Sequence, residues 1–229
     1  MPSYEETYLR HADAYDELVR HEDHEGNVRA FLSRAIPEPV ARVVELGCGT
    51  GRVTGMLLGR ARAIHAYDAS AHMIDFARAA LPDPSVVFGV ADNALLPEAD
   101  GQADVTVAGW SIGHVTGFFP DAWEAHARAA LEEMRRVTRP GGRLVVLETL
   151  GTCVETAGPP NERLCAYYTL LEEVYGFGRE VLSTDYAFPS AERAAVVMGA
   201  FFGDAMAARV GARGAARVPE FTGAWTSRR

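Results

Sequence analysis

A glycine-rich run in the first quarter of the chain has the residue types and spacing of a ligand-binding loop. Residues 41–52 read A-R-V-V-E-L-G-C-G-T-G-R, so that glycines alternate at positions 47, 49 and 51. Glycine permits left-handed backbone and lacks the Cβ atom that would keep a ligand away. Because a helical pattern resumes at Val53, the free N–H groups of a helix start would point into the same crevice. We therefore interpret residues 43–58 as a buried strand, a cofactor-binding turn and a helix.

Two acidic residues near this loop favour one kind of cofactor over another. Asp68 lies 21 residues beyond Gly47, at the end of the next apolar run, where a carboxylate can accept both hydroxyls of an adenosine ribose. Dinucleotides and S-adenosylmethionine both carry this ribose. The dinucleotide pattern G-x-G-x-x-G needs glycine where this chain has Arg52, and Glu45 suits a cationic ligand better than a pyrophosphate. The loop therefore favours S-adenosylmethionine, with a nicotinamide dinucleotide as the alternative.

The elements that must position these residues alternate between strand and helix. We expect the core strands at 43–46, 63–67, 86–90, 103–108 and 143–147, and the core helices at 53–60, 69–80 and 121–137. Two amphipathic helices within 3–35, separated by an acidic solvated turn that Asp23 caps, precede them. A helix at 161–175, a strand at 181–188, a helix at 190–209 and a strand at 217–226 follow.

This alternation predicts an α/β fold with a doubly wound parallel sheet and helices on both faces. In such sheets a ligand lies outside the carboxyl ends of the strands, where the strand order reverses. We expect one domain over 1–229. It comprises N-terminal capping helices at 1–38, a cofactor-binding core at 39–150, an acceptor-side insertion at 151–180, and C-terminal strands and a helix at 181–229.

Composition and charge argue against several classes of partner. A net charge of −9 disfavours nucleic acid, whose phosphates need a basic face. No apolar run approaches the roughly 18–20 residues of a membrane span, and the polar, acidic start is unlike a secretory signal. Three cysteines without C-x-x-C spacing favour a reducing compartment. We expect a soluble, cytoplasmic monomer or homodimer with a small-molecule partner, no nucleic acid and no membrane.

Three further segments, taken in order with the glycine run, identify a family. They are Asp92-Asn93-Ala94, residues 103–110 (A-D-V-T-V-A-G-W) and residues 131–144 (L-E-E-M-R-R-V-T-R-P-G-G-R-L). The chain thereby resembles the class I S-adenosylmethionine-dependent methyltransferases, in particular the ubiquinone/menaquinone-biosynthesis-like group that acts on small molecules. The resemblance covers Val43 to about Leu147. It implies a Rossmann-like sheet of seven strands, mostly parallel with an antiparallel last strand.

The resemblance also implies roles for individual residues. Glu45 and the loop Gly47-Cys48-Gly49 would hold the methionine part of S-adenosylmethionine. Asp68 would bind the ribose, while Asp92 would accept from the adenine amino group. The cofactor-binding residues implied in this way are Tyr15, Glu45, Gly47, Cys48, Gly49, Asp68, Ala69, Met73, Asp92, Asn93, Ala94, Gly109 and Trp110. For Met73 plain core packing is an equally good interpretation, and the transfer would leave S-adenosylhomocysteine.

Methyl transfer from a sulfonium depends mainly on proximity and orientation, because the donor is already activated. A base is needed only if the acceptor must lose a proton, and His114, just after the fourth strand, is the candidate. The alternative for His114 is a hydrogen-bonded structural histidine. Glu148, at the end of the fifth strand, would orient an acceptor or cap the strand. Residues 109–116 contain no acid, so we expect no metal.

Two parts of the chain would complete an acceptor site. Tyr4, Tyr8 and Tyr15 are spaced to form a lid, although helix packing explains them equally well. The helix at 161–175, with Tyr167 and Tyr168, would line a cavity beside Trp110 and His114. If that cavity were filled, the chain would instead be a non-catalytic protein that binds S-adenosylmethionine or S-adenosylhomocysteine.

Overall fold

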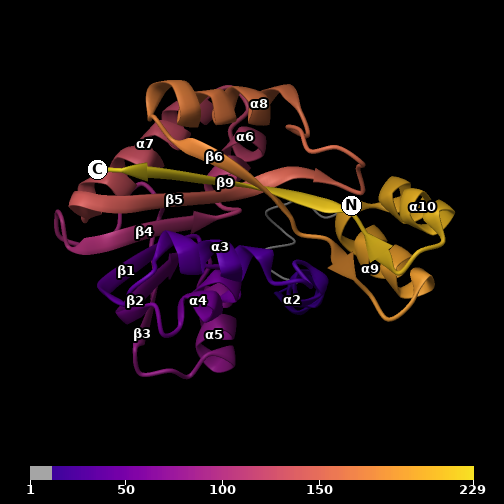
Figure 1. The fold of residues 1–229 in the computed structure, drawn as a ribbon, viewed down its shortest axis with the longest axis horizontal. Helices are drawn as coiled ribbons and strands as arrows, with labels where there is room; N and C mark the ends of the chain where they lie inside the picture. The colour runs from indigo at the N-terminus through magenta and orange to yellow at the C-terminus, as the bar shows by residue number, and fades with distance from the viewer. Residues whose placement is uncertain (1–11) are drawn as a thin grey trace.

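The computed structural model describes residues 12–229, and a single large sheet runs through it (Figure 1). Its strand order is β3-β2-β1-β4-β5-β9-β6, and β9 runs antiparallel to both of its neighbours. The strands of this sheet are β1 (Val40–Leu46), β2 (Ala61–Asp68), β3 (Val86–Val90), β4 (Ala103–Gly109), β5 (Thr138–Thr152), β6 (Gly178–Ser183) and β9 (Glu220–Arg228). The predicted fold class, including the antiparallel last strand, is confirmed.

The strand order reverses between β1 and β4, which pair in parallel over Val43–Leu46 and Val105–Ala108. From β1 the chain winds outward to β2 and β3, then returns to β4 on the other side. Loops that leave β1 and β4 consequently diverge, and a crevice opens at their carboxyl ends. The glycine loop follows β1, so the fold places it at this crevice.

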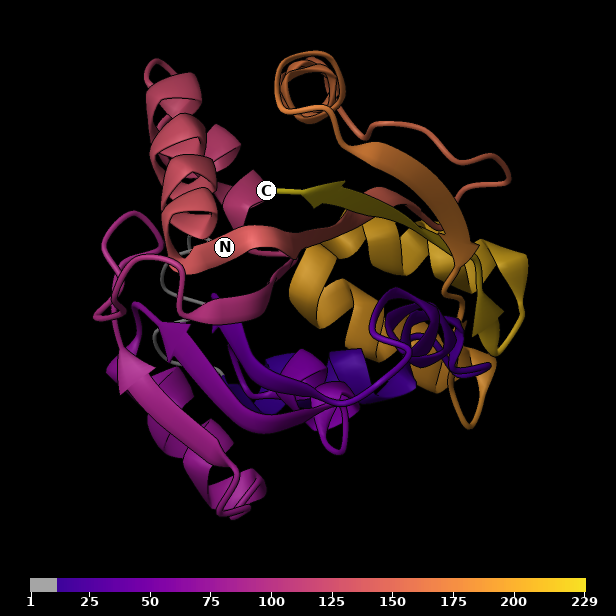
Figure 2. The same cartoon turned by 60° about the vertical axis from the view of Figure 1, so that its left-hand side comes forward.

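Helices cover both faces of the sheet, as Figure 2 shows from the side. The helices are α2 (Ala12–His21), α3 (Asn27–Ala35), α4 (Arg52–Leu57), α5 (Ala71–Ala80), η1 (Ile112–His114), α6 (Val115–Phe118), α7 (Trp123–Val137), α8 (Glu162–Thr169), η2 (Leu170–Val174), α9 (Ala191–Phe202) and α10 (Asp204–Arg213). One face buries apolar residues of α3 and α4 against β1, β4 and β5. The opposite face buries α7, α8 and η2 against β4, β5 and β9.

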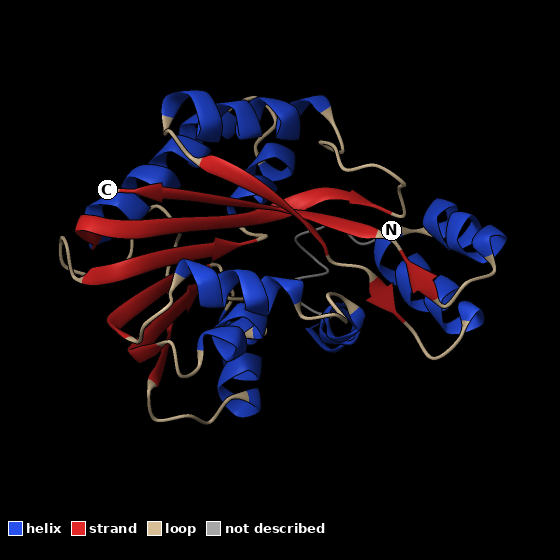
Figure 3. Ribbon diagram, viewed as in Figure 1, coloured by secondary structure: helices blue, strands red, loops and turns tan. Residues whose placement is uncertain are grey.

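A smaller lobe lies beyond the carboxyl end of β5, where Figure 3 shows α9, α10 and a short two-stranded ribbon beside α2. The ribbon consists of β7 (Tyr186–Ala187) and β8 (Arg217–Val218). Its apolar core includes Leu18 from α2 together with Tyr186, Phe188 and Met198. We call residues 12–25 and 184–219 the cap, because α2 joins the C-terminal elements there.

The C-terminal half differs in detail from the sequence prediction. The helix expected at 190–209 is broken at Gly203, whose φ of 90° ends α9 and starts α10. The strand expected at 181–188 is divided between β6 and β7. The helix expected at 161–175 continues from α8 into a π-helical turn, η2. The first two differences lie where the chain enters or folds within the cap, whereas η2 packs on the sheet with α8.

The turn between α2 and α3 is less solvated than the sequence suggested. Asp23 is buried and has a φ of 55°. Its carboxylate accepts from the N–H groups of Asn27 at 2.7 Å and Val28 at 3.0 Å, so it caps α3 as expected. Tyr4 and Tyr8 lie outside the described residues.

Candidate active site

A cavity of about 570 Å³ lies at the carboxyl ends of β1, β2 and β4. It is lined by the predicted residues Glu45, Gly47, Cys48, Gly49, Asp68, Ala69, Met73, Asp92, Asn93, Ala94, Gly109, Trp110 and His114. Of the predicted set this leaves only Tyr15, which belongs to α2 and whose side chain is outside the described part of the chain. The topology thus brings together residues that lie up to 69 positions apart in the sequence (45 to 114).

The glycine loop follows a path that side chains would block. Gly47, Gly49 and Gly51 have φ angles of 66°, 53° and 89°. A Cβ atom on Gly47 would lie 2.3 Å from the Cβ of Ser111, and one on Gly51 would lie 2.8 Å from Leu81. The loop therefore needs glycine both for its backbone conformation and for its packing.

Asp68 lies at the end of β2 and faces the glycine loop across the cavity. Its Oδ2 accepts from the N–H of Gly49 at 2.9 Å, and its Oδ1 accepts from the N–H of Ser70 at 2.8 Å. Burial raises the pKa of this carboxyl. A carboxylate offers about four acceptor positions, so two remain in this half-buried group. Two acceptor positions on one carboxylate are what a pair of neighbouring hydroxyls requires.

Glu45 and Cys48 also line this edge of the cavity, and burial raises the pKa of each. Thr54 Oγ1 donates to Glu45 Oε2 at 2.6 Å. Burial, assisted by the charge of Asp68, raises the pKa of Glu45 to about 8. Burial also raises the pKa of the Cys48 thiol well above its usual value, which makes this cysteine a poor nucleophile. A cation in the cavity would favour ionisation of Glu45.

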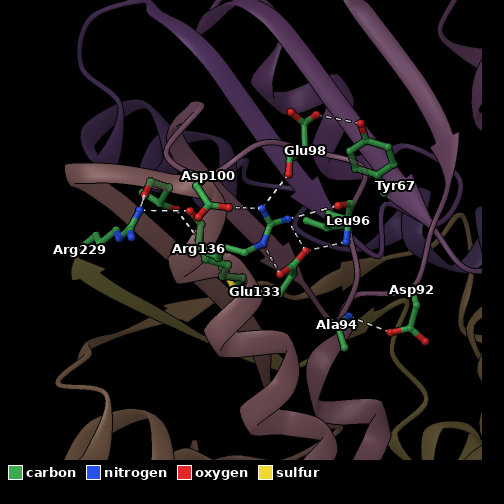
Figure 4. A network of polar contacts seen from close by, with 11 residues as sticks. Tyr67, Asp92, Ala94, Leu96, Glu98, Asp100, Glu133, Arg136 and Arg229 are labelled. Atoms are coloured by element: carbon green, nitrogen blue, oxygen red, sulfur yellow. Dashed lines mark hydrogen bonds and ion pairs between the residues drawn. The ribbon is translucent and has the colours of Figure 1, made fainter.

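Asp92 starts the loop after β3. Its Oδ1 accepts from the N–H of Ala94 at 2.7 Å, and its backbone carbonyl accepts from the N–H of Leu95 at 2.9 Å. Figure 4 shows the Asp92 carboxylate with one oxygen toward Ala94 and the other turned away. Asp92 is exposed at the cavity, so an oxygen remains for an amino group of a ligand.

Trp110 and Arg52 form a stacked pair on the opposite side of the cavity, and both line it. The Arg52 guanidinium lies 4.4 Å from the centroid of the Trp110 ring. Its Nη1 donates to Glu22 Oε2 at 2.8 Å, in an ion pair whose side chains are 11% and 6% exposed. Trp110 has a φ of 48°, which is unusual for a large side chain. In the sequence Arg52 stands out only as a departure from a glycine pattern, and its contacts with Trp110 and Glu22 have no sequence signal.

His114 and Glu148 are connected through one short turn. Burial lowers the pKa of His114 to about 4, so its imidazole is neutral near pH 7. Glu148 does not line the cavity. Its Oε1 instead accepts from the N–H of Gly113 at 2.8 Å, and burial raises its pKa to about 8. Glu148 therefore holds the η1 turn, and neither role expected for it describes this contact.

The cavity wall beyond His114 comes from α6 and α7 rather than from the expected helix. Phe118, Phe119 and His126 line it, with the Phe119 and His126 rings stacked 3.9 Å apart. No residue of 161–175 lines the cavity, so that expectation is wrong. Tyr167 and Tyr168 are buried in the core with Trp225 because α8 packs on the sheet.

Residues 12–229 contain neither a cluster of side chains suited to a metal ion nor a helix that could span a membrane. Within 12–229, no group of three or more histidine, cysteine or acidic side chains is arranged to hold a metal ion. Within the same range, no helix combines the length and apolar character needed to cross a bilayer.

The fold and the glycine loop define a Rossmann-like protein with a cavity at the topological switch point of its sheet. Residues 44–146 match the family model described as a methyltransferase domain. An uncharacterised methyltransferase of Mycobacterium tuberculosis is 35% identical over 109 residues, which are 48% of this chain and 40% of that relative.

A demethylmenaquinone methyltransferase of Beutenbergia cavernae is 32% identical over 159 residues, or 69% of this chain and 56% of that relative. The chain thus spans roughly half of these relatives' length or less. The solved Haemonchus contortus phosphoethanolamine N-methyltransferase 2, in complex with S-adenosyl-L-methionine, superposes with a TM-score of 0.60. That superposition covers 100% of this chain and 61% of the other at 16% identity, and it concerns the fold.

Proposed function

We propose that this protein transfers a methyl group from S-adenosylmethionine to a small-molecule acceptor. The observation that carries the proposal is the convergence on one cavity of the glycine loop, Asp68 and Asp92. Their free acceptor positions suit a ribose and an adenine amino group. S-adenosylmethionine would supply an electrophilic methyl group on a sulfonium.

The residues around the cavity support a cationic ligand rather than a pyrophosphate. Glu45 and Asp68 line the cavity beside the glycine loop, and a bound cation would favour their ionised forms whereas a pyrophosphate would disfavour them. Arg52 is engaged with Trp110 and Glu22, which leaves it poorly placed to neutralise phosphates. We assign Glu45, Gly47, Cys48 and Gly49 to the methionine part, Asp68, Ala69 and Met73 to the adenosine, and Asp92, Asn93 and Ala94 to the adenine edge.

Gly109 and Trp110, at the end of β4, would then lie beside the sulfonium. The Trp110 ring and its stacked Arg52 would exclude water from the transfer site. His114 is our candidate base for acceptors that must lose a proton. Because its pKa is lowered to about 4, it would be unprotonated and available at neutral pH.

The compartment, the oligomeric state and the kinds of partner expected from the sequence belong to the same proposal. We propose a cytoplasmic protein that acts as a monomer or homodimer, on a small molecule and not on nucleic acid, without a metal. Methyltransferase relatives support the reaction class. Neither a nicotinamide-dependent oxidoreductase nor a non-catalytic binding protein has an observation in its favour.

Calorimetry with S-adenosylmethionine, S-adenosylhomocysteine and NAD⁺ tests the donor assignment. We expect both sulfur compounds to bind and NAD⁺ to bind at least about 100-fold more weakly, a difference of about 2.7 kcal/mol. Equal or tighter binding of NAD⁺ would overturn the assignment. Incubation with methyl-labelled S-adenosylmethionine and a metabolite extract, followed by mass spectrometry, would then identify the methylated acceptor.

The same assay tests His114 once an acceptor is known. We expect His114→Ala to lower turnover by about 100-fold, the usual contribution of a general base, while the affinity for S-adenosylhomocysteine changes less than about two-fold. His126→Ala is the matched control, since His126 also lines the cavity but belongs to α7. Unchanged turnover in His114→Ala would make His114 a structural residue.

A further inference from the structure

The loop that carries Asp92 has little structure of its own. Residues 91–102 connect β3 to β4 without a helix or strand, and their first turn is closed by bonds from Ala94 and Leu95 to Asp92. Leu95 is 77% exposed, so the tip makes little contact with the core. The N–H of Ala91 donates to the carbonyl of Asp68 at 3.0 Å, so Asp92 is held from the preceding side by one bond and otherwise depends on how the following residues are anchored.

One arginine of α7 supplies most of that anchorage (Figure 4). Arg136 Nη1 donates to the carbonyl of Glu98 at 2.8 Å and to Asp100 Oδ1 at 2.7 Å. Its Nη2 donates to the carbonyl of Leu96 at 3.3 Å. Three points of the loop, within five residues of one another, are thereby fixed to one guanidinium.

Glu133 completes the contact from one helical turn before Arg136. Its two oxygens accept from Arg136 Nε and Nη2, each at 2.7 Å. Glu133 Oε1 also accepts from the N–H of Leu96 at 2.7 Å. The Glu133 carboxylate, whose side chain is 8% exposed, therefore holds both the guanidinium and the loop. Bidentate, charge-assisted bonds of this kind fix geometry as well as adding energy.

Leu96 and Glu98 of the loop are also held by contacts with the sheet and the core. The Glu98 carboxylate accepts from Tyr67 Oη at 2.8 Å and contacts His65 and Arg42 of the sheet. Leu96 is 4% exposed in the core. The stretch 96–100 is thus rigid, and it lies only four residues beyond Asp92.

We propose that Arg136, held by Glu133, is a positioning residue for recognition of the adenine 6-amino group through Asp92. This inference rests on the proposed function, because it assumes an adenosyl ligand in the cavity. Without the guanidinium, the Leu96 and Glu98 carbonyls lose their partner and Glu133 keeps a buried charge. The segment from 92 to 100 then loosens, and Asp92 no longer meets the amino group in one fixed geometry.

The test compares two ligands that differ only at the base. Calorimetry would measure S-adenosylhomocysteine and S-inosylhomocysteine, whose base has an oxygen in place of the 6-amino group. For the native chain we expect a preference of about ten-fold or more for the adenosyl compound, as for loss of a charge-assisted bond. In Arg136→Met we expect that preference to fall to about two-fold, with S-inosylhomocysteine binding nearly unchanged.

The neighbouring residue provides a matched control. Arg135 is on the same turn of α7 and also pairs with an acid three residues earlier, but its contact with Glu132 is at the surface at 3.9 Å. Arg135→Met should keep the full preference. Arg136→Lys, which keeps the charge without the forked geometry, should give an intermediate preference and serves if Arg136→Met does not fold.

The outcomes separate the inference from the proposed function. If Arg136→Met and Arg136→Lys weaken both ligands equally or leave the preference intact, the residue is only structural and the inference is overturned. Equal binding of the two ligands by the native chain overturns it as well. Binding of neither ligand by the native chain would overturn the proposed function itself. Faster hydrogen exchange at the Leu96 amide in Arg136→Met would show independently that the loop has been released.

Discussion

The cofactor-facing edge of the sheet and the cap are held together in different ways. At this edge, which we call the donor edge and define by the ends of β1 to β4 and their loops, acids bind nearby backbone. Asp68 accepts from Ser70 two residues on, and Asp92 accepts from Ala94 two residues on. In the cap, acids pair with arginines far along the chain. Glu17 pairs with Arg193, and Glu25 with Arg217 at 2.8 Å.

This difference explains what the two regions can do. A carboxylate that uses local N–H groups keeps its other acceptor positions oriented relative to its own loop. The donor edge is therefore preorganised for a ligand. The cap depends on pairs more than 150 residues apart and on one mixed apolar core. Of the residues that the structure describes, none that lines the cavity belongs to the cap, so contacts inside the cap can change without altering the cavity wall directly.

The largest expected effect concerns Arg52, which joins the two regions. Arg52→Met would leave Glu22 buried without its partner in the turn that follows α2. Removing one member of a buried ion pair costs about 3–5 kcal/mol. At roughly 2–4 °C per kcal/mol for a chain of this size, thermal unfolding should shift down by about 10 °C.

Two further variants test whether the ion pair between Arg52 and Glu22 couples the stability of the donor edge to that of the cap. Arg52→Met combined with Glu22→Gln should recover part of the lost stability, since no unpaired charge remains. Arg193→Met breaks an exposed pair inside the cap and should cost less than about 1 kcal/mol. Strictly additive losses in the double variant would mean that the two side chains are energetically independent.

A smaller effect, a loss of ligand affinity, is expected from a substitution at the donor edge alone. Asp68→Ala should weaken S-adenosylhomocysteine binding by about ten-fold or more, or about 1.4 kcal/mol, through loss of the ribose acceptor. Asp75→Ala is the control, because Asp75 on α5 is exposed and its ion pair within residues 12–229 is with Arg78. Unchanged affinity in Asp68→Ala, measured by calorimetry, would remove the ribose assignment.

The difference between local contacts at the donor edge and long-range contacts in the cap explains which features could be predicted from the sequence. The glycine run predicts the loop because φ angles of 53° to 89° and a 2.3 Å clash leave few residue types at these positions. Ser70 caps the next helix with a hydroxyl that accepts from the N–H of Met73, a contact that serine commonly makes at a helix start. The stacking of Arg52 on Trp110 could not be predicted, because it depends on the meeting of loops 58 residues apart.

The cap was harder to predict for the same reason. A helix pattern over 190–209 says nothing of the break at Gly203, which is set by packing against Leu18 and the β7–β8 ribbon. Tyr167 and Tyr168 look like cavity residues in the sequence, since aromatic side chains serve in cores and pockets alike. Only the position of α8 on the sheet buries them beside Trp225.

The smallest expected effect concerns Glu148, which connects β5 to the turn carrying His114. Burial raises the pKa of Glu148 from 4.5 to about 8, so the folded chain keeps a proton that the unfolded chain releases. Stability from this group therefore decreases as pH rises from about 4.5 to about 8. Glu148→Gln keeps an oxygen for the N–H of Gly113 and removes this dependence.

Thermal unfolding of the ligand-free protein at several pH values between 5 and 8 checks this expectation. The native chain should lose stability over this range, and Glu148→Gln should lose less. Some dependence should remain, because the pKa of Glu45 is also raised to about 8. Glu45→Gln with Glu148→Gln should reduce it further, and the remainder should come from acids such as Glu22, Asp68 and Glu220, whose pKa values burial also raises. Identical pH profiles for the native chain and Glu148→Gln would mean that Glu148 is ionised in the fold. The η1 turn would then be held by a charged contact, as in the cap, and not by a neutral local one.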